Sequence, residues 1–332
     1  MPIEKRRSKP PDSSYLQVEL SGLIDFPASA REMRHMFSVI GIVIVFGAVL
    51  AGFLMEKGPI AVLVQPSEFV IIGGAAIGTM LAANPMYVLK KIANGLKDVL
   101  AGSKYSKIRY LDSLKMMFAL FNKARKEGLN AIETDIEEPS KSPFFSKYPV
   151  FLKNHHARDF VCDTMRMAIT GGATPFDVDQ MMELDMEVHH AGATSPATAL
   201  TTVADALPGL GIVAAVLGVV VTMSSLGGPP EEIGHKVASA LVGTFLGILL
   251  CYGMVGPLAT NLSKLVDDEH AYYHVLRVVM LAFIKGMSPI LAVEMGRRAI
   301  PEHVRPSFQE VEKSCRQRDD SSEPAAKAAG KG

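Results

Sequence analysis

The sequence predicts an all-α integral membrane protein, with four transmembrane helices and a large helical cytoplasmic domain between spans two and three. Hydrophobic residues make up 48% of the 332 residues, and four segments contain no Asp, Glu, Lys, Arg or His. These segments are residues 36–55, 69–88, 206–226 and 237–263. A helix needs about 20 apolar residues to cross about 30 Å of hydrocarbon, so each segment is long enough to span a membrane.

The composition also argues against several other classes of protein. The 34 Lys and Arg residues balance 34 Asp and Glu residues, which disfavours a nucleic-acid partner, because such binders carry an excess of cations. Three cysteines without CxxC spacing predict neither a disulfide framework nor a zinc site. No HExxH, GxSxG or P-loop motif occurs in a suitable context, so we expect no enzymatic activity, no cofactor and no metal. We interpret the paired histidines as solvated helix faces: His155 and His156, His189 and His190, and His270 and His274.

The distribution of Lys and Arg predicts the orientation in the membrane. Lys57 is the only such residue between spans one and two, and Lys236 is the only one between spans three and four. The other 32 lie in the N-terminal tail, between residues 90 and 166, and from residue 264 onward. Because cations concentrate on the cytoplasmic side, we expect both termini and the long middle segment to be cytoplasmic.

The elements follow in chain order. Residues 1–35 form a polar N-terminal extension without the features of a signal peptide. Residues 36–88 carry the first two spans and a short outer loop, and residues 89–202 form the cytoplasmic domain. Residues 203–263 carry the last two spans, also with a short outer loop. Residues 264–312 continue as cytoplasmic helices, and the polar, Ala- and Lys-rich residues 313–332 are expected to be disordered.

Local signals place three helices in the cytoplasmic domain. Apolar residues recur at helical spacing over 111–121, and Gly128 can end that helix. A second helix is expected over 154–171. Thr174 as N-cap and Pro175 at the first helical position predict the start of a third helix, and residues after it form a small-residue connection into span three.

Within the spans, small residues four apart predict close helix packing. Three pairs have this spacing: Gly74 and Gly78, Ala214 and Gly218, and Gly243 and Gly247. The spacing fits packing inside one subunit and contact between subunits equally well. The four predicted spans contain no carboxylate and no histidine, so a transported ion would need a carboxylate from another chain.

Several ungapped segments resemble the MotA family of flagellar stator subunits. They include LPGLGIVAAVLGVV at 207–220, LVGTFLGILLCYG at 241–253 and QPSEFVIIGGA at 65–75. The shorter segments are GPLA at 256–259, SKY at 103–105, DIEEP at 135–139, AVEMGRR at 292–298 and RPSF at 305–308. The resemblance covers about residues 37–312, and the N-terminal extension has no counterpart in a typical member.

The resemblance implies a torque-generating unit in the bacterial inner membrane. In this family five copies surround two copies of a one-span partner, MotB, whose transmembrane Asp carries the ion. The positions matching Pro208 and Pro257 lie at the cytoplasmic ends of spans three and four and couple ion passage to movement. Thr244 matches a hydroxyl that faces the ion path. Ala215 stands where sodium-driven relatives carry a second hydroxyl, so protons are the favoured ion.

The resemblance also implies contact with a rotor protein, FliG, which drives flagellar rotation, motility and chemotaxis. The matching charged positions are Arg125 and Glu133. Either residue would otherwise be an ordinary exposed helix charge.

Two alternatives compete with this hypothesis. A TolQ- or ExbB-like subunit would share the membrane core and energise envelope processes, but those relatives have three spans and an outside N-terminus. A self-sufficient channel or transporter would need ionisable residues within its spans. An intramembrane enzyme is a third, more distant alternative.

Overall fold

The computed structural model describes residues 30–224 and 226–316 of the chain. Most of the N-terminal extension expected over 1–35, and the C-terminal tail beyond residue 316, lie outside the described residues. The described part is helical throughout, without a β-strand. Four of its helical segments are long and apolar enough to cross a membrane, as predicted: Phe37–Met55, Ile60–Ala83, Pro175–Met223 and Pro230–Ile284.

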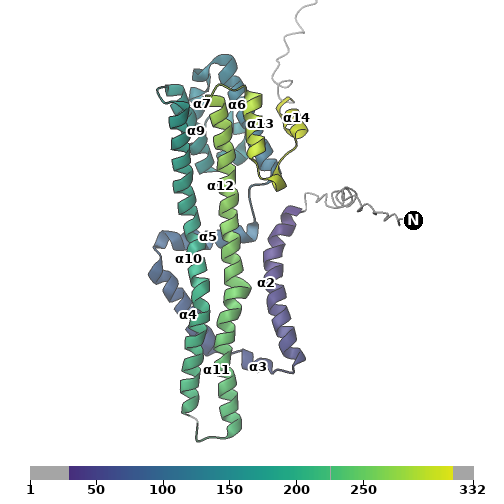
Figure 1. Cartoon of the computed structure of the whole chain (residues 1–332), viewed down its shortest axis with the longest axis vertical. Coiled ribbons are helices and arrows are strands. Elements are labelled where there is room, and N and C mark those ends of the chain that lie inside the picture. The colour runs from purple at the N-terminus through teal and green to yellow at the C-terminus, as the bar shows by residue number, and fades with distance from the viewer. Residues whose placement is uncertain (1–29, 225, 317–332) are drawn as a thin grey trace, which may run out of the picture.

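The membrane part is built on a long helical pair. The chain forms α2 (Ala30–Met55), α3 (Ile60–Leu63) and α4 (Pro66–Ala83), and later α10 (Pro175–Met223) and α11 (Pro230–Leu250). A π-helical turn, Cys251–Val255, joins α11 to α12 (Gly256–Ile284), so one nearly continuous rod runs antiparallel to α10. Figure 1 shows α2 and α4 on opposite sides of this column.

The second span differs from its prediction at both ends. It was expected over 69–88, but α4 begins at Pro66 and ends at Ala83. The helix ends there because Pro85 has no N–H to donate and restricts the residue before it. The chain then starts a separate helix, α5 (Met86–Ala101), which crosses the column in Figure 1. The earlier start brings Glu68 into the span.

The helices of the domain that we expect to be cytoplasmic, called the cytoplasmic domain below, gather at one end of the column (Figure 1). They are α6 (Lys107–Glu127), α7 (Glu133–Glu137), α8 (Pro149–Leu152), α9 (His155–Thr170), α13 (Pro289–Ala299) and α14 (Phe308–Arg316). Together with α10 and α12 they bury a core in which the rings of Phe121 and Phe283 stack at 4.0 Å. The last helix continues to Arg316, so the expectation of disorder from residue 313 is wrong for its first four residues.

The predicted helix boundaries in this domain are confirmed. Gly128 ends α6 with φ +92°, a conformation that side chains with a Cβ rarely adopt. Asn154 caps α9 by accepting a hydrogen bond from the Ala157 N–H at 3.3 Å. Thr174 and Asp177 form a complete capping box at the start of α10.

Helix α10 has 49 residues and therefore runs about 74 Å. The connection expected before span three is itself helical, and the boundary drawn at residue 203 falls inside this helix. The membrane part and the cytoplasmic domain thus share one uninterrupted helix.

Candidate ion path and torque site

Close contact between α10 and α11 depends on glycine. A Cβ added to Gly211 would lie 2.7 Å from the carbonyl oxygen of Gly243 and 3.1 Å from the Cα of Gly247. A Cβ added to Gly218 would lie 2.7 Å from the Cβ of Ala240 in α11. The Gly243–Gly247 and Ala214–Gly218 pairs therefore pack inside this chain, because the missing side chains let the two backbones approach.

The third small-residue pair behaves differently. A Cβ added to Gly74 or to Gly78 would meet no other atom within 4 Å in the described part of the chain. Among the described residues, nothing packs on α4 at these two glycines.

Thr244 and Ala215 lie at one level of the α10–α11 pair. The Cα of Thr244 is 3.3 Å from a Cβ placed on Gly211, and the backbone nitrogen of Ala215 is 3.2 Å from one placed on Gly243. Both side chains are half-buried. The structure brings these two predicted positions together.

Pro208 lies inside α10 without breaking it. A proline at this position leaves the carbonyl of Ala204 without its usual intrahelical donor. The carbonyl of the preceding residue, Leu207, lies against Gly247 of α11. The helix is thus locally weakened at its contact with α11.

A second proline of α10, Pro196, was not singled out from the sequence. Its ring frees the carbonyl of Gly192, and the Lys91 Nζ of α5 donates a hydrogen bond to that oxygen at 3.1 Å. The two prolines therefore differ, because a side chain from another helix satisfies the carbonyl freed at Pro196.

Pro257 follows the π-helical turn between α11 and α12. The N–H of Gly256 donates to the carbonyl of Cys251, five residues back. Pro257 is exposed and lines a hollow of about 660 Å³ together with Asp205 and Lys264. Pro257 thus follows an irregular turn of the helical column, whereas Pro208 lies within a continuous α-helix.

Glu68 is a candidate that the sequence reasoning missed. It is 5% exposed, its carboxylate contacts Gly243, and its Oε2 atom has no hydrogen-bond partner. The neighbouring Gln65 Nε2 donates to the Ser239 Oγ of α11 at 3.0 Å, which holds the start of α4 in place. The candidate span Ile60–Ala83 therefore contains a carboxyl group, which the predicted span beginning at Phe69 left out. Pro66, favoured at the first position of a helix, was the signal for the earlier start.

The two predicted rotor-contact residues lie at a corner of the cytoplasmic domain. Arg125 is in the last turn of α6 and Glu133 begins α7, and both side chains are exposed. Within the described residues, neither forms an ion pair. Buried contacts of Asp135 stabilise this corner. Its carboxylate forms an ion pair with Lys123 at 2.7 Å and accepts a hydrogen bond from the Ser142 Oγ at 2.5 Å.

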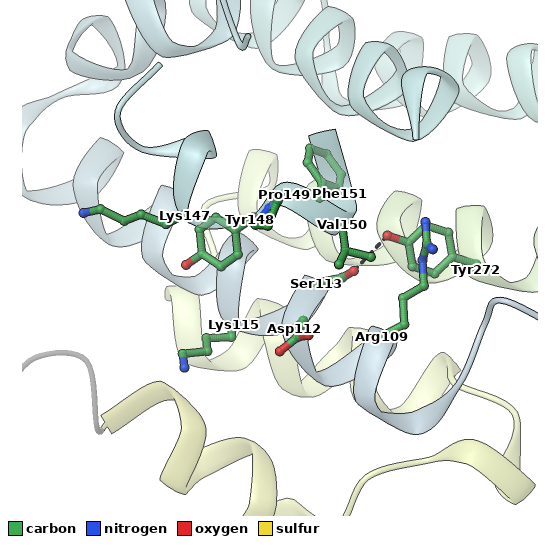
Figure 2. A pocket seen from close by; sticks show the side chains of 10 residues that line it. All are labelled: Arg109, Asp112, Ser113, Lys115, Lys147, Tyr148, Pro149, Val150, Phe151 and Tyr272. Carbon is green, nitrogen blue, oxygen red and sulfur yellow. Dashed lines mark hydrogen bonds between the residues drawn. The ribbon is translucent and has the colours of Figure 1, made fainter. Parts of the chain in front are cut away.

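A pocket of about 420 Å³ opens elsewhere in this domain (Figure 2). Its floor includes the hydroxyl pair of Ser113 and Tyr272, 2.8 Å apart. Figure 2 shows Lys147 directed away from Arg109, so the cations that line the pocket do not converge on one point.

Some histidines depart from the solvated faces expected for them. The rings of His156 and His189 stack at 3.7 Å and both pack edge-on against Tyr273. Burial and the neighbouring His189 lower the pKa of His156. Across the described residues, no three His, Cys, Asp or Glu side chains form a group able to hold a metal ion.

Comparison with known proteins gives this arrangement its context. A family model described as Motility protein A N-terminal matches residues 39–128, and one described as MotA/TolQ/ExbB proton channel family matches residues 152–274. Motility protein A of Salmonella typhimurium is 38% identical over 281 residues, which cover 85% of this chain and 95% of that protein. The chain belongs to the motility protein A family.

Other members of the family give the same result. Motility protein A of Escherichia coli K12 is 39% identical over 85% of this chain and 95% of its own length. Chemotaxis protein LafT of Vibrio parahaemolyticus is 31% identical over 84% of this chain and 98% of its own length.

Solved structures share the fold of this motility protein A family member. The C. jejuni MotAB structure matches with a TM-score of 0.67 at 19% identity, covering 82% of this chain and 98% of that chain. The flagellar MotAB stator complex from Bacillus subtilis matches with a TM-score of 0.63 at 24% identity, covering 86% and 99%.

Proposed function

We propose that this chain is a stator subunit of the bacterial flagellar motor, which couples ion flow through the inner membrane to torque. The observation that carries the proposal is the 38–39% identity to two proteins named Motility protein A over nearly their whole length. That match includes the α10–α12 segment with Pro208, Thr244 and Pro257.

The unit acts with a MotB-like partner that has one span and an ion-carrying Asp. Five copies of this chain surround two copies of the partner, and Gly74 and Gly78, free within one subunit, lie on a face of α4 available to other chains. Both termini and the α6–α9 domain lie in the cytoplasm, in keeping with the cation distribution.

Protons are the transported ion, because Ala215 supplies a methyl group at the level of Thr244 and cannot ligate sodium. Ion passage shifts α10 and α12 about Pro208 and Pro257. The exposed corner with Arg125 and Glu133 then acts on the rotor protein FliG.

The test uses a strain lacking this chain, complemented by wild type, Pro208→Ala or Pro196→Ala. We expect flagellated but paralysed deletion cells, rescue by wild type and poor rescue by Pro208→Ala. Pro196→Ala is the matched control, because Lys91 already satisfies the carbonyl that this proline frees, and it should swim normally. Normal swimming of the deletion strain with a defective cell envelope would instead favour a TolQ- or ExbB-like role.

A further inference from the structure

A carboxylic acid lies inside the second membrane-spanning helix. Glu68 occupies the first turn of α4, and its buried carboxylate rests against Gly243 of α11. A Cβ on Gly243 would overlap the Oε2 atom of Glu68, so glycine at this position makes room for the acid. The carboxylate is enclosed between helices and does not face outward.

The surroundings of Glu68 supply no compensating charge. Among the described residues no cation pairs with it, and its Oε2 atom accepts no hydrogen bond. The residues of α10 that contact Gly243 beside Glu68 are Ala214 and Ala215, which are uncharged. The short helix α3 also carries no charged side chain. The titratable residues of α11 all precede Gly243: Glu231, Glu232, His235 and Lys236. Of these, Lys236 pairs with Glu232 at 2.8 Å.

The depth of Glu68 places it at the level of the predicted ion path. Gly243 lies six residues after the predicted start of span four at residue 237, which is about 9 Å along the helix. Thr244 is the next residue, and Ala215 lies opposite. Three positions at one depth thus combine a hydroxyl, a methyl group and a carboxyl group.

An unpaired carboxylate is costly in an apolar environment, whereas the protonated acid is neutral and can donate a hydrogen bond. Ionisable residues within spans mark ion or proton pathways in membrane proteins. A purely structural alternative also exists, since an acid in the first turn of a helix interacts favourably with the helix dipole.

We propose that Glu68 is a proton-binding site of this subunit, taking up a proton as its carboxylate becomes a carboxylic acid and releasing the same proton during each transport cycle. The proposal rests on the proposed stator function and adds a second acid to the one on the partner. The unpaired Oε2 atom is where the proton binds.

The first experiment compares Glu68→Gln, Glu68→Asp and the control Glu56→Gln in the deletion strain. Glu56 is an exposed acid at the outer end of α2 and should be replaceable. Glu68→Gln keeps the size and the hydrogen-bonding ability of the side chain but cannot cycle a proton. We expect it to reach the membrane, to co-purify with the partner and to swim at least tenfold more slowly. Glu68→Asp should retain partial speed. Wild-type swimming by Glu68→Gln would overturn the proposal.

The second experiment reads the proton directly and does not depend on motility. Infrared difference spectra of the purified complex of this chain with its partner, recorded between pH 8 and pH 5, should contain bands from two buried carboxylic acids, the partner's Asp and Glu68. The Glu68 band should be absent in Glu68→Gln and shifted in Glu68→Asp, while the band of the partner's Asp remains in both. Spectra of Glu68→Gln that are identical to wild type, or a Glu68 band that responds to sodium at fixed pH, would overturn the proposal. Because paralysis of the deletion strain is scored separately, failure of the stator function and failure of the Glu68 site are distinguishable.

Discussion

Lys123 and Asp135 form an ion pair, with 2.7 Å between Nζ and Oδ2, across the corner where α6 gives way to α7. The same carboxylate accepts a hydrogen bond from the Ser142 hydroxyl. The oxygen of that hydroxyl in turn accepts hydrogen bonds from the backbone N–H groups of Phe144 and Phe145. Asp135 is buried, so its charge depends on these partners. This network fixes the backbone from which Arg125 and Glu133 project.

Asp135→Ala should destabilise the cytoplasmic domain by about 3 kcal/mol, because it leaves the Lys123 cation and the Ser142 hydroxyl without their acceptor. Chemical denaturation of the purified protein measures the change. Glu138→Ala is the control: its pair with Lys141 at 3.2 Å is exposed and should contribute less than about 1 kcal/mol. Equal losses for the two variants would contradict the structural role of Asp135.

Arg125→Glu should slow swimming several-fold while leaving the protein as stable as wild type. The side chain is exposed, so reversing its charge removes no packing. A charge reversal on the rotor surface should restore part of the speed. Lys153→Glu, another exposed charge of the same domain, should swim normally. Unimpaired swimming by Arg125→Glu would exclude this residue from the torque site.

The His156–His189 stack predicts a loss of stability in acid. The pKa of His156 is lowered in the folded protein, whereas an unfolded histidine has a pKa of about 6.5. The unfolded chain therefore binds more protons. The contribution of His156 to the free energy of unfolding is fully present above about pH 6.5 and is lost as the pH falls toward the folded-state pKa. Thermal unfolding at pH 7.5 and 5.5 measures the decline.

His156→Gln should make that pH dependence shallower, because one lowered pKa is removed. The exposed neighbour His155 offers a control, and His155→Gln should keep the wild-type slope. Identical slopes in all three proteins would mean that the stack does not link stability to pH.

Gly211→Ala should separate α10 from α11, since the added methyl group would lie 2.7 Å from the carbonyl oxygen of Gly243. Overpacking of this kind costs about 2 kcal/mol. We expect less folded protein in the membrane and loss of swimming. Gly78→Ala adds the same methyl group to open space within the chain, so folded protein should accumulate normally. A motile Gly211→Ala strain would show that the helices can move apart without cost.

Helix ends marked by local chemistry were predictable from the sequence. Thr174 with Asp177, Asn154 and Gly128 act within one turn of the chain, so their types alone indicate where a helix starts or stops. The four spans were predictable for a similar reason, because their length and apolarity are properties of single segments.

Properties that depend on contacts between distant segments were not predictable in the same way. Two local signals, Pro66 at the start of α4 and Pro85 after its end, were missed because the span was read from the length of apolar sequence alone. The stacking of His156 on His189 joins α9 to α10, and the bond from Lys91 to Gly192 joins α5 to α10. No periodicity within one helix contains that information.

The unbroken course of α10 has a mechanical consequence. From Pro208 to Pro175 the helix extends about 50 Å, and at Pro196, the proline between them, Lys91 bonds the freed carbonyl of Gly192. A tilt of about 10° at Pro208 would therefore sweep the capping box at Thr174 through about 9 Å by rigid-rod geometry. The helix acts as a lever, in which a small tilt at Pro208 becomes a stroke larger than a helical turn at the N-terminal end of α10.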